Sequence, residues 1–185
     1  MGSGSNGPYC SGLSGSQPYA PIYHVVSEMM ERDKKDINIY KPSTGYFINP
    51  LALSIQDSIV NNQVKMNGHS AHGTYTYVLN TDGNIVFAKR FNPNNSKSRA
   101  PHPTLIGGKD PVVQCAGMIH FDKGRITWYN NDSGHFRPNS KSLEKVDVAI
   151  NKLREKYPNI FIATQIINQT SKKQTILHNR KRKFF

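Results

Sequence analysis

The chain is poor in acidic residues, in cysteine and in long apolar runs, and each shortage excludes a class of protein. No apolar run approaches the roughly 20 residues that a membrane-spanning helix needs, so no membrane span is expected. The two cysteines form no CxxC pair and no His–Cys cluster at zinc spacing, so neither a structural metal nor another bound cofactor is predicted. Whether Cys10 and Cys115 pair stays open. Only 12 acidic residues face 24 lysines and arginines, which gives a formal net charge of +12.

Part of this basic charge lies in two stretches that contain no acidic residue. Residues 171–185 hold Lys172, Lys173, Arg180, Lys181, Arg182 and Lys183, and residues 85–109 hold Lys89, Arg90, Lys97, Arg99 and Lys109. Such charge attracts polyanions: RNA, DNA, nucleotides or an acidic protein. For the tail considered by itself, we favour the interpretation that its charge forms a solvated surface and only keeps the protein soluble. The two stretches together favour an anionic substrate or partner.

The residue pattern predicts an α+β fold in one domain. Residues 1–19 are rich in Gly, Ser and Pro and are expected to be a flexible leader or tag. Residues 20–168 are expected to form a single catalytic or toxin domain, and residues 169–185 a basic tail. Ile, Val, Tyr and Thr are plentiful relative to Leu, which favours sheet.

Three helices are predicted from apolar residues spaced three or four apart. The first begins at Pro21, with a buried stripe of Ile22, Val25, Val26, Met29 and Met30. The second follows Asn49-Pro50, and the third runs from Ser142 to Tyr157, with Leu143, Val146, Ile150 and Leu153 buried. The apolar residues 160–167 then predict a buried strand, whereas residues 92–99 are too polar for regular structure.

Two β-hairpins form the centre of the predicted sheet. Residues 74–80 and 84–90 flank Asp82-Gly83, a two-residue turn signal that makes facing residue numbers sum to 165. In the same way, residues 112–122 and 125–131 flank Lys123-Gly124, with facing numbers that sum to 247.

The second hairpin has one apolar and one polar face. We expect the core face to hold Val113, Cys115, Ile119, Phe121, Ile126 and Trp128. The other face meets water or a substrate and holds Gln114, His120, Thr127, Tyr129, Asn131, Ser133 and His135. Since this register sets Val112 opposite His135, His135 lies at the open end of the hairpin. His102 enters at that end, whereas His120 lies roughly 25 Å away near the turn.

His102 and His135 are therefore the predicted catalytic pair. Two imidazoles can act as base and acid in phosphodiester cleavage without a metal, one accepting the ribose 2′-hydroxyl proton and the other protonating the leaving 5′-oxygen. The predicted substrate-binding residues around them are Lys89, Arg90, Lys109, Ser133 and Arg137. In the alternative interpretation, both histidines only hydrogen-bond to loop backbones.

The run YVLNTDGNIVFAKR, followed by HPTLIGGKDPVVQCAGMIHFDKGRITWYNNDSGHFRP, resembles a module of bacterial polymorphic-toxin C-terminal domains. The module is also similar to part of the plant IQ-motif calmodulin-binding proteins. A DG turn, an H-S-S-F element, an A-G strand and a final S-G-H-Y-x-P map in order onto residues 75–138. Here H-S-S-F is replaced by His102-Pro103-Thr104-Leu105 and S-G-H-Y by Ser133-Gly134-His135-Phe136, so both histidines are kept.

The resemblance implies a secreted effector toxin that is delivered into the cytoplasm of a competing cell, with a cognate immunity protein that we expect to be acidic. The first functional hypothesis is a metal-independent ribonuclease that uses the histidine pair. A second is an ADP-ribosyltransferase or NAD-consuming toxin, based on His72-Gly73-Thr74. The third is a non-enzymatic basic module that binds nucleic acid or an acidic protein.

Overall fold

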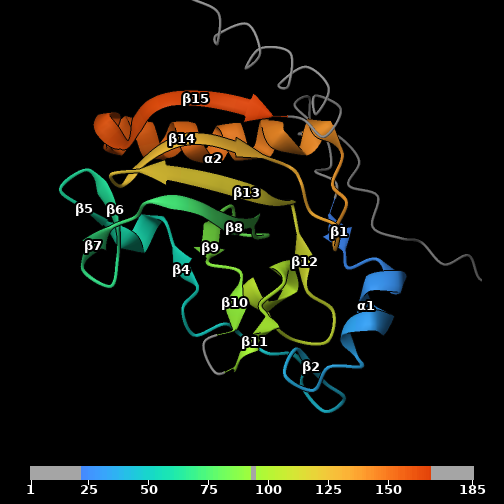
Figure 1. Ribbon diagram of the computed structural model, residues 1–185. Coiled ribbons are helices and arrows are strands. Elements are labelled where there is room, and N and C mark those ends of the chain that lie inside the picture. The colour runs from blue at the N-terminus through green and yellow to red at the C-terminus, as the bar shows by residue number, and fades with distance from the viewer. Residues whose placement is uncertain (1–21, 93–94, 168–185) are drawn as a thin grey trace, which may run out of the picture.

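A computed structural model describes residues 22–92 and 95–167 of the chain (Figure 1). The predicted leader (residues 1–19) and the whole of the predicted basic tail (residues 169–185) lie outside these residues, as does Cys10. The α-helices are α1 (Ser27–Asp33) and α2 (Leu143–Lys156), and short 3₁₀ turns cover Gln56–Ser58, His102–Leu105, Ser140–Ser142 and Pro158–Ile160. The strands are β1 (Tyr23–His24), β2 (Tyr40–Lys41), β3 (Gly45–Tyr46), β4 (Leu53–Ser54), β5 (Ile59–Val60), β6 (Gln63–Met66), β7 (His69–Ser70), β8 (Gly73–Leu79), β9 (Ile85–Ala88), β10 (Phe91–Asn92), β11 (Asn95–Arg99), β12 (Val112–Val113), β13 (Cys115–Asp122), β14 (Arg125–Asn130) and β15 (Phe161–Ile167).

A six-stranded sheet in the order β15-β14-β13-β8-β9-β4 organises the described residues. Its pairs are antiparallel except that β15 runs parallel to β14, after the crossover through α2. Side chains alternate along each strand, so successive residues enter two separate apolar clusters. The predicted α+β class is confirmed.

The first face of the sheet packs against α2. The buried residues of this helix are Leu143, Val146, Ala149, Ile150 and Leu153, so the predicted apolar stripe is confirmed. They meet Tyr77, Phe87 and Ile119 of the sheet, among others. The turn before the helix is capped by Asn139, whose side chain accepts a hydrogen bond from the Ser142 backbone N–H, rather than by Ser142 itself.

The second face of the sheet is covered by N-terminal segments and is largely closed to water. Residues of β2 and β3 and the Leu105 side chain pack there against Val78 and Ala116. Residues of α1 also contact this cluster. The polar face expected of the second hairpin is therefore wrong in part, because its members Asn131, Ser133 and His135 are buried beneath this cover.

Two helix predictions near the N-terminus are wrong in extent or in kind. The helix predicted from Pro21, which lies outside the described residues, is absent over residues 22–26, because β1 pairs with β12 and the Val26 backbone N–H donates to His135 O, so α1 begins at Ser27. After Asn49-Pro50 the chain turns instead of forming a helix. The Asn49 side chain accepts from the Leu51 N–H, and residues of β4 then pair with β9.

The first hairpin differs from its predicted register by one residue. Val78 faces Val86, so facing numbers sum to 164 and the loop contains three residues, 81–83. The Asn80 side chain causes this, since its Oδ1 accepts the backbone N–H groups of Asp82 and Asn84. Gly83, with φ +81°, supplies the left-handed last position of such a loop.

A β-bulge alters the second hairpin in the middle. Phe121 faces Ile126 as predicted, but His120 faces Trp128, which leaves Thr127 as an extra residue on β14. Beyond the bulge, the residues of β14 lie on the faces of the sheet opposite to those predicted. Tyr129 is buried in the core in place of Trp128, whose ring instead stacks on His120 with centroids 5.5 Å apart.

Three further predictions concern chain segments at the edges. Residues 92–99, expected to be irregular, include parts of the paired strands β10 and β11. The strand predicted over residues 160–167 is present as β15, but it lies at the sheet edge, and Ile162 is exposed. Among the described residues, no helix is long and apolar enough to cross a membrane.

Gly117 on β13 generates a stability prediction. A Cβ at this position would lie 2.0 Å from Asn130 O, so Gly117→Ala forces two strands of the sheet apart. We expect it to lower the free energy of unfolding by about 2–3 kcal/mol, measured by urea denaturation. The matched control is Gly134→Ala, whose Cβ would meet nothing closer than Met29 Cε at 3.8 Å. It should change stability by less than about 0.5 kcal/mol, and an equal loss in both variants would contradict the prediction.

Candidate functional site

The structure brings His102 and His135 together on the second face of the sheet. His102 begins the 3₁₀ turn after Pro101, and His135 lies in the turn between β14 and α2. Their ring centroids are 6.4 Å apart, and the two residues are 3% and 1% exposed. The route to this proximity differs from the predicted one, because Val112 pairs with His24 rather than with His135.

Asp33 at the end of α1 holds His135. Its Oδ2 lies 2.9 Å from His135 Nε2 and accepts a second hydrogen bond from the Tyr46 hydroxyl at 3.2 Å. Because an ionised carboxylate can only accept, Nε2 of His135 must carry a proton. Asp33 is itself 2% exposed, so this carboxylate–imidazole contact lies in the interior of the protein.

Arg32 contacts both residues of this pair and is itself partly exposed to solvent. Its Nη2 lies 3.2 Å from Asp33 Oδ1 and 3.3 Å from His135 Nε2, and its side chain is 43% exposed. Since both nitrogens carry protons, the second distance is a close approach and not a hydrogen bond. Arg32 and His135 therefore both contact the Asp33 carboxylate, Arg32 at Oδ1 and His135 at Oδ2.

The charges of this cluster follow from its contacts. Burial alone would raise the pKa of Asp33, but the hydrogen bond and charge of His135, followed by those of Arg32, outweigh it and lower the pKa below the usual value. The pKa of Tyr46 is raised by burial and by the neighbouring carboxylate, so its hydroxyl stays a donor. Asp33 is thus an anion at neutral pH.

His102 is neutral at the same pH. Burial lowers its pKa from 6.5 to about 4, and the positive charges of His135 and Arg90 act in the same direction, against a hydrogen bond to Gly117 O. That bond joins Nε2 to the carbonyl oxygen at 2.9 Å, so Nε2 carries the proton of the neutral ring. Nδ1 therefore holds the lone pair that could accept a proton.

The other predicted site residues lie in four different settings. Ser133 is buried and shapes the turn, since its backbone O accepts from Arg137 N and its Oγ accepts from Phe136 N. Arg137 is exposed, and its Nη2 donates to Glu28 Oε2 at 3.0 Å. Lys89 and Arg90 are exposed at the end of β9, whereas Lys109 lies on the wall of a separate cavity of about 420 Å³.

His72 of the NAD hypothesis lies away from the histidine pair. Its exposed ring contacts Asp122 Oδ1 at 3.3 Å, near the turn of the second hairpin. Gly117, which His102 contacts, is five residues from Asp122 along β13, roughly 16 Å away in an extended strand. No observation in the described residues joins His72 to a catalytic glutamate.

Sequence reasoning missed Arg32, Asp33 and Tyr46. One signal was present in the pattern: Asp33 lies four residues after Met29 and three after Met30, so it continues the apolar stripe of the helix. A carboxylate on such a stripe needs a buried partner. The identity of that partner, 102 residues later, follows from the tertiary structure alone.

The arrangement contains the parts of an acid–base site: a neutral imidazole, a second imidazole held by a carboxylate, and a guanidinium at the surface. Cys115 belongs to the opposite face, where its buried free thiol contacts Ser142 Oγ at 3.1 Å. Within the part of the chain that the structure describes, no group of three or more His, Cys, Asp or Glu side chains could hold a metal ion. No family model, curated protein or solved structure matches the chain.

The neutral state of His102 predicts a dependence of stability on pH. Between pH 6.5 and about 4 the unfolded chain binds a proton at this residue that the folded protein does not, so stability falls as the pH falls through this window. The full loss amounts to about 3 kcal/mol and is complete below pH 4. The contribution of Asp33, whose pKa is depressed, is lost only at lower pH, below the unfolded value of 3.8.

Urea denaturation across this range measures the effect. His102→Gln, which keeps an N–H donor for Gly117 O and cannot titrate, should flatten the slope. His69→Gln at an exposed position is the matched control and should keep the wild-type slope. A wild-type slope in His102→Gln would contradict the assignment.

Proposed function

We propose that this chain is an RNA-cleaving toxin domain in which His102 is the general base and His135 the general acid. The observation that carries the proposal is the 6.4 Å separation of a neutral His102 from a His135 held by the ionised Asp33. Two neighbouring titratable groups in unlike electrostatic environments form the usual basis of acid–base catalysis. The site also has a cation at its surface, Arg32, for the charge that develops on a phosphate.

The reaction balances without any further reactant. His102 Nδ1 accepts the proton of a ribose 2′-hydroxyl, and the 2′-oxygen forms a bond to the adjacent phosphorus. The bond from phosphorus to the 5′-oxygen breaks, and His135 gives its proton to that oxygen. Asp33 accepts a hydrogen bond from His135 Nε2 and so fixes the orientation of this ring for the transfer. The products are a 2′,3′-cyclic phosphate and a 5′-hydroxyl end.

Because both imidazoles are buried, this mechanism requires a conformational change before RNA can bind. RNA reaches them only when part of the cover on the second face moves aside while Asp33 keeps its contact with His135.

We further propose that the domain is delivered into the cytoplasm of a recipient cell and is neutralised by an acidic immunity protein. The resemblance of residues 75–138 to polymorphic-toxin domains supports delivery. The net charge of +12 supports an acidic partner, because opposite charge accelerates association.

The burial of the histidines, at 3% and 1% exposed, favours a second candidate. In it the chain binds RNA or an acidic protein through its basic surface without cleaving anything. His102 and His135 then serve only to join the turns that carry them to β13 and α1.

Incubation of the purified protein with total RNA in EDTA tests the proposal. We expect RNA fragments with cyclic phosphate ends, and a loss of about 10²-fold or more in rate for His102→Gln and for His135→Gln. Glutamine keeps a donor for Gly117 O or Asp33, which avoids the uncompensated buried charge that His135→Ala would leave. His24→Gln is the matched control and should cleave as the wild type does.

Circular dichroism shows whether each variant is folded. Full cleavage by a folded His135→Gln protein would refute the catalytic pair. Intact RNA with loss of NAD after expression in a bacterial cytoplasm would replace the proposal with an NAD-consuming toxin. Bound but intact RNA would select the second candidate.

A further inference from the structure

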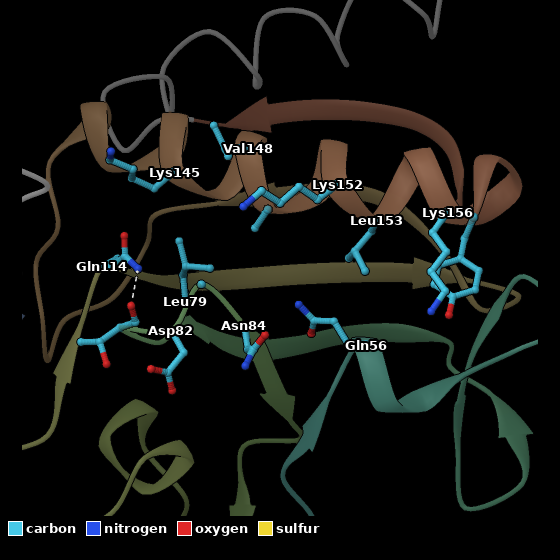
Figure 2. A pocket seen from close by; sticks show the side chains of 14 residues that line it. Gln56, Leu79, Asp82, Asn84, Gln114, Lys145, Val148, Lys152, Leu153 and Lys156 are labelled. Atoms are coloured by element: carbon cyan, nitrogen blue, oxygen red, sulfur yellow. Dashed lines mark hydrogen bonds between the residues drawn. The ribbon is translucent and has the colours of Figure 1, made fainter. Parts of the chain in front are cut away.

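A cavity of about 590 Å³ lies between α2 and the β8–β9 hairpin (Figure 2). Its lining residues Leu79 and Leu153 belong to the apolar cluster on the first face of the sheet, whereas the histidine pair lies on the second face. We call it the α2 cleft. The described residues that line it are Gln56, Leu79, Thr81, Asp82, Gly83, Asn84, Gln114, Lys145, Val148, Ala149, Lys152, Leu153, Lys156 and Tyr157. Its volume lies in the range of sites for small ligands, and nothing in the proposed cleavage reaction uses it.

One wall of the α2 cleft is a row of lysines. Lys145, Lys152 and Lys156 are seven and four residues apart, so a regular helix places them within about 40° of one another around its axis. Their Cα atoms extend over roughly 16 Å along that axis. Among the described residues, none of the three forms an ion pair with a carboxylate, although Lys156 Nζ lies 5.2 Å from the centre of the Tyr157 ring.

The facing wall is polar and carries one negative charge. Figure 2 shows α2 on one side and Gln114, Asn84 and Gln56 on the other. The Gln114 side chain donates to the backbone oxygens of Asn80 and Thr81, which fixes the hairpin loop at this edge. Asp82 is the one acidic residue among the described lining residues, so the cleft has an excess of two positive charges.

Apolar groups complete the α2 cleft. Leu79 and Leu153 belong to the buried core, and Val148 adds an exposed apolar side chain. Tyr157 contributes an aromatic ring that is only partly buried. A row of cations beside aromatic and apolar surface is the combination with which proteins bind the backbone and bases of a single strand.

We propose that the α2 cleft binds a short segment of single-stranded nucleic acid, with phosphates at Lys145, Lys152 and Lys156 and a base against Tyr157. The length of the lysine row favours several phosphates in a chain over one isolated anion. The concave shape with polar side chains on the facing wall favours a narrow strand over a folded acidic protein. This inference does not depend on RNA cleavage, because the histidine pair lies across the sheet.

Fluorescence anisotropy with a labelled oligodeoxythymidylate tests it. This probe has no 2′-hydroxyl, so the proposed chemistry cannot cleave it, and binding is measured apart from activity. We expect the triple variant Lys145→Gln/Lys152→Gln/Lys156→Gln to bind about tenfold or more weakly. The slope of log K against log salt should become shallower by about 2, since each lost phosphate contact on a single strand removes about 0.7.

The matched control removes the same charge elsewhere, at the exposed residues Lys35, Lys41 and Lys123. Lys35→Gln/Lys41→Gln/Lys123→Gln should keep the wild-type slope. Equal losses in the two triple variants would show attraction by net charge alone and would overturn the proposal. An unchanged slope in the triple variant of the α2 cleft would also overturn the proposal, even if that variant no longer bound an acidic protein.

Discussion

A buried contact between Asp33 and His135 joins two distant parts of the chain and fixes the second face of the sheet. An ionised carboxylate inside a protein is costly unless its hydrogen bonds are satisfied. Here the imidazole, the Tyr46 hydroxyl and the Arg32 guanidinium together satisfy it. The position of α1 therefore depends on the turn after β14, and that turn depends on α1. Whatever chemistry His135 performs, the same contact also holds the N-terminal cover on the sheet.

The sheet separates two environments with different physical properties. On the second face, two imidazoles lie in an enclosed cluster, where burial lowers the pKa of His102. On the first face, the α2 cleft presents solvent-accessible lysines whose interactions weaken with salt. The two sites therefore respond to different variables, pH for the first and ionic strength for the second. This difference allows their roles to be separated in one protein.

Much of the fold is predictable from the sequence because local patterns determine it. The stripe of α2 and both hairpins follow from the spacing of apolar residues and from the turn signals Asp82-Gly83 and Lys123-Gly124. The registers were less predictable. The Asn80 side chain lengthened the first loop, and no local signal marked the bulge at Thr127. Pairing of β1 with β12 replaced the start of the first helix, since tertiary hydrogen bonds outweigh weak local propensity.

The candidate site was predictable only in part for the same reason. His102 and His135 stood out by their surroundings, but the partner Asp33 lies more than a hundred residues from His135 in the sequence. The expectation that the polar residues around His135 meet solvent failed because α1 and the β2–β3 hairpin cover them. Alternation along a strand indicates which side chains share a face. It does not indicate what covers that face.

The bulge at Thr127 restricts how the length of this chain can change over evolution. One extra residue decides that Tyr129 enters the core and that Trp128 lies outside against His120. Loss or gain of a single residue in β14 would move every side chain between that point and the turn that carries His135 to the opposite face of the sheet. Insertions and deletions between Ile126 and Asn131 are therefore tolerable in pairs and selected against singly. In related chains, the length of this segment should therefore differ only by even numbers of residues, even where the residues themselves differ.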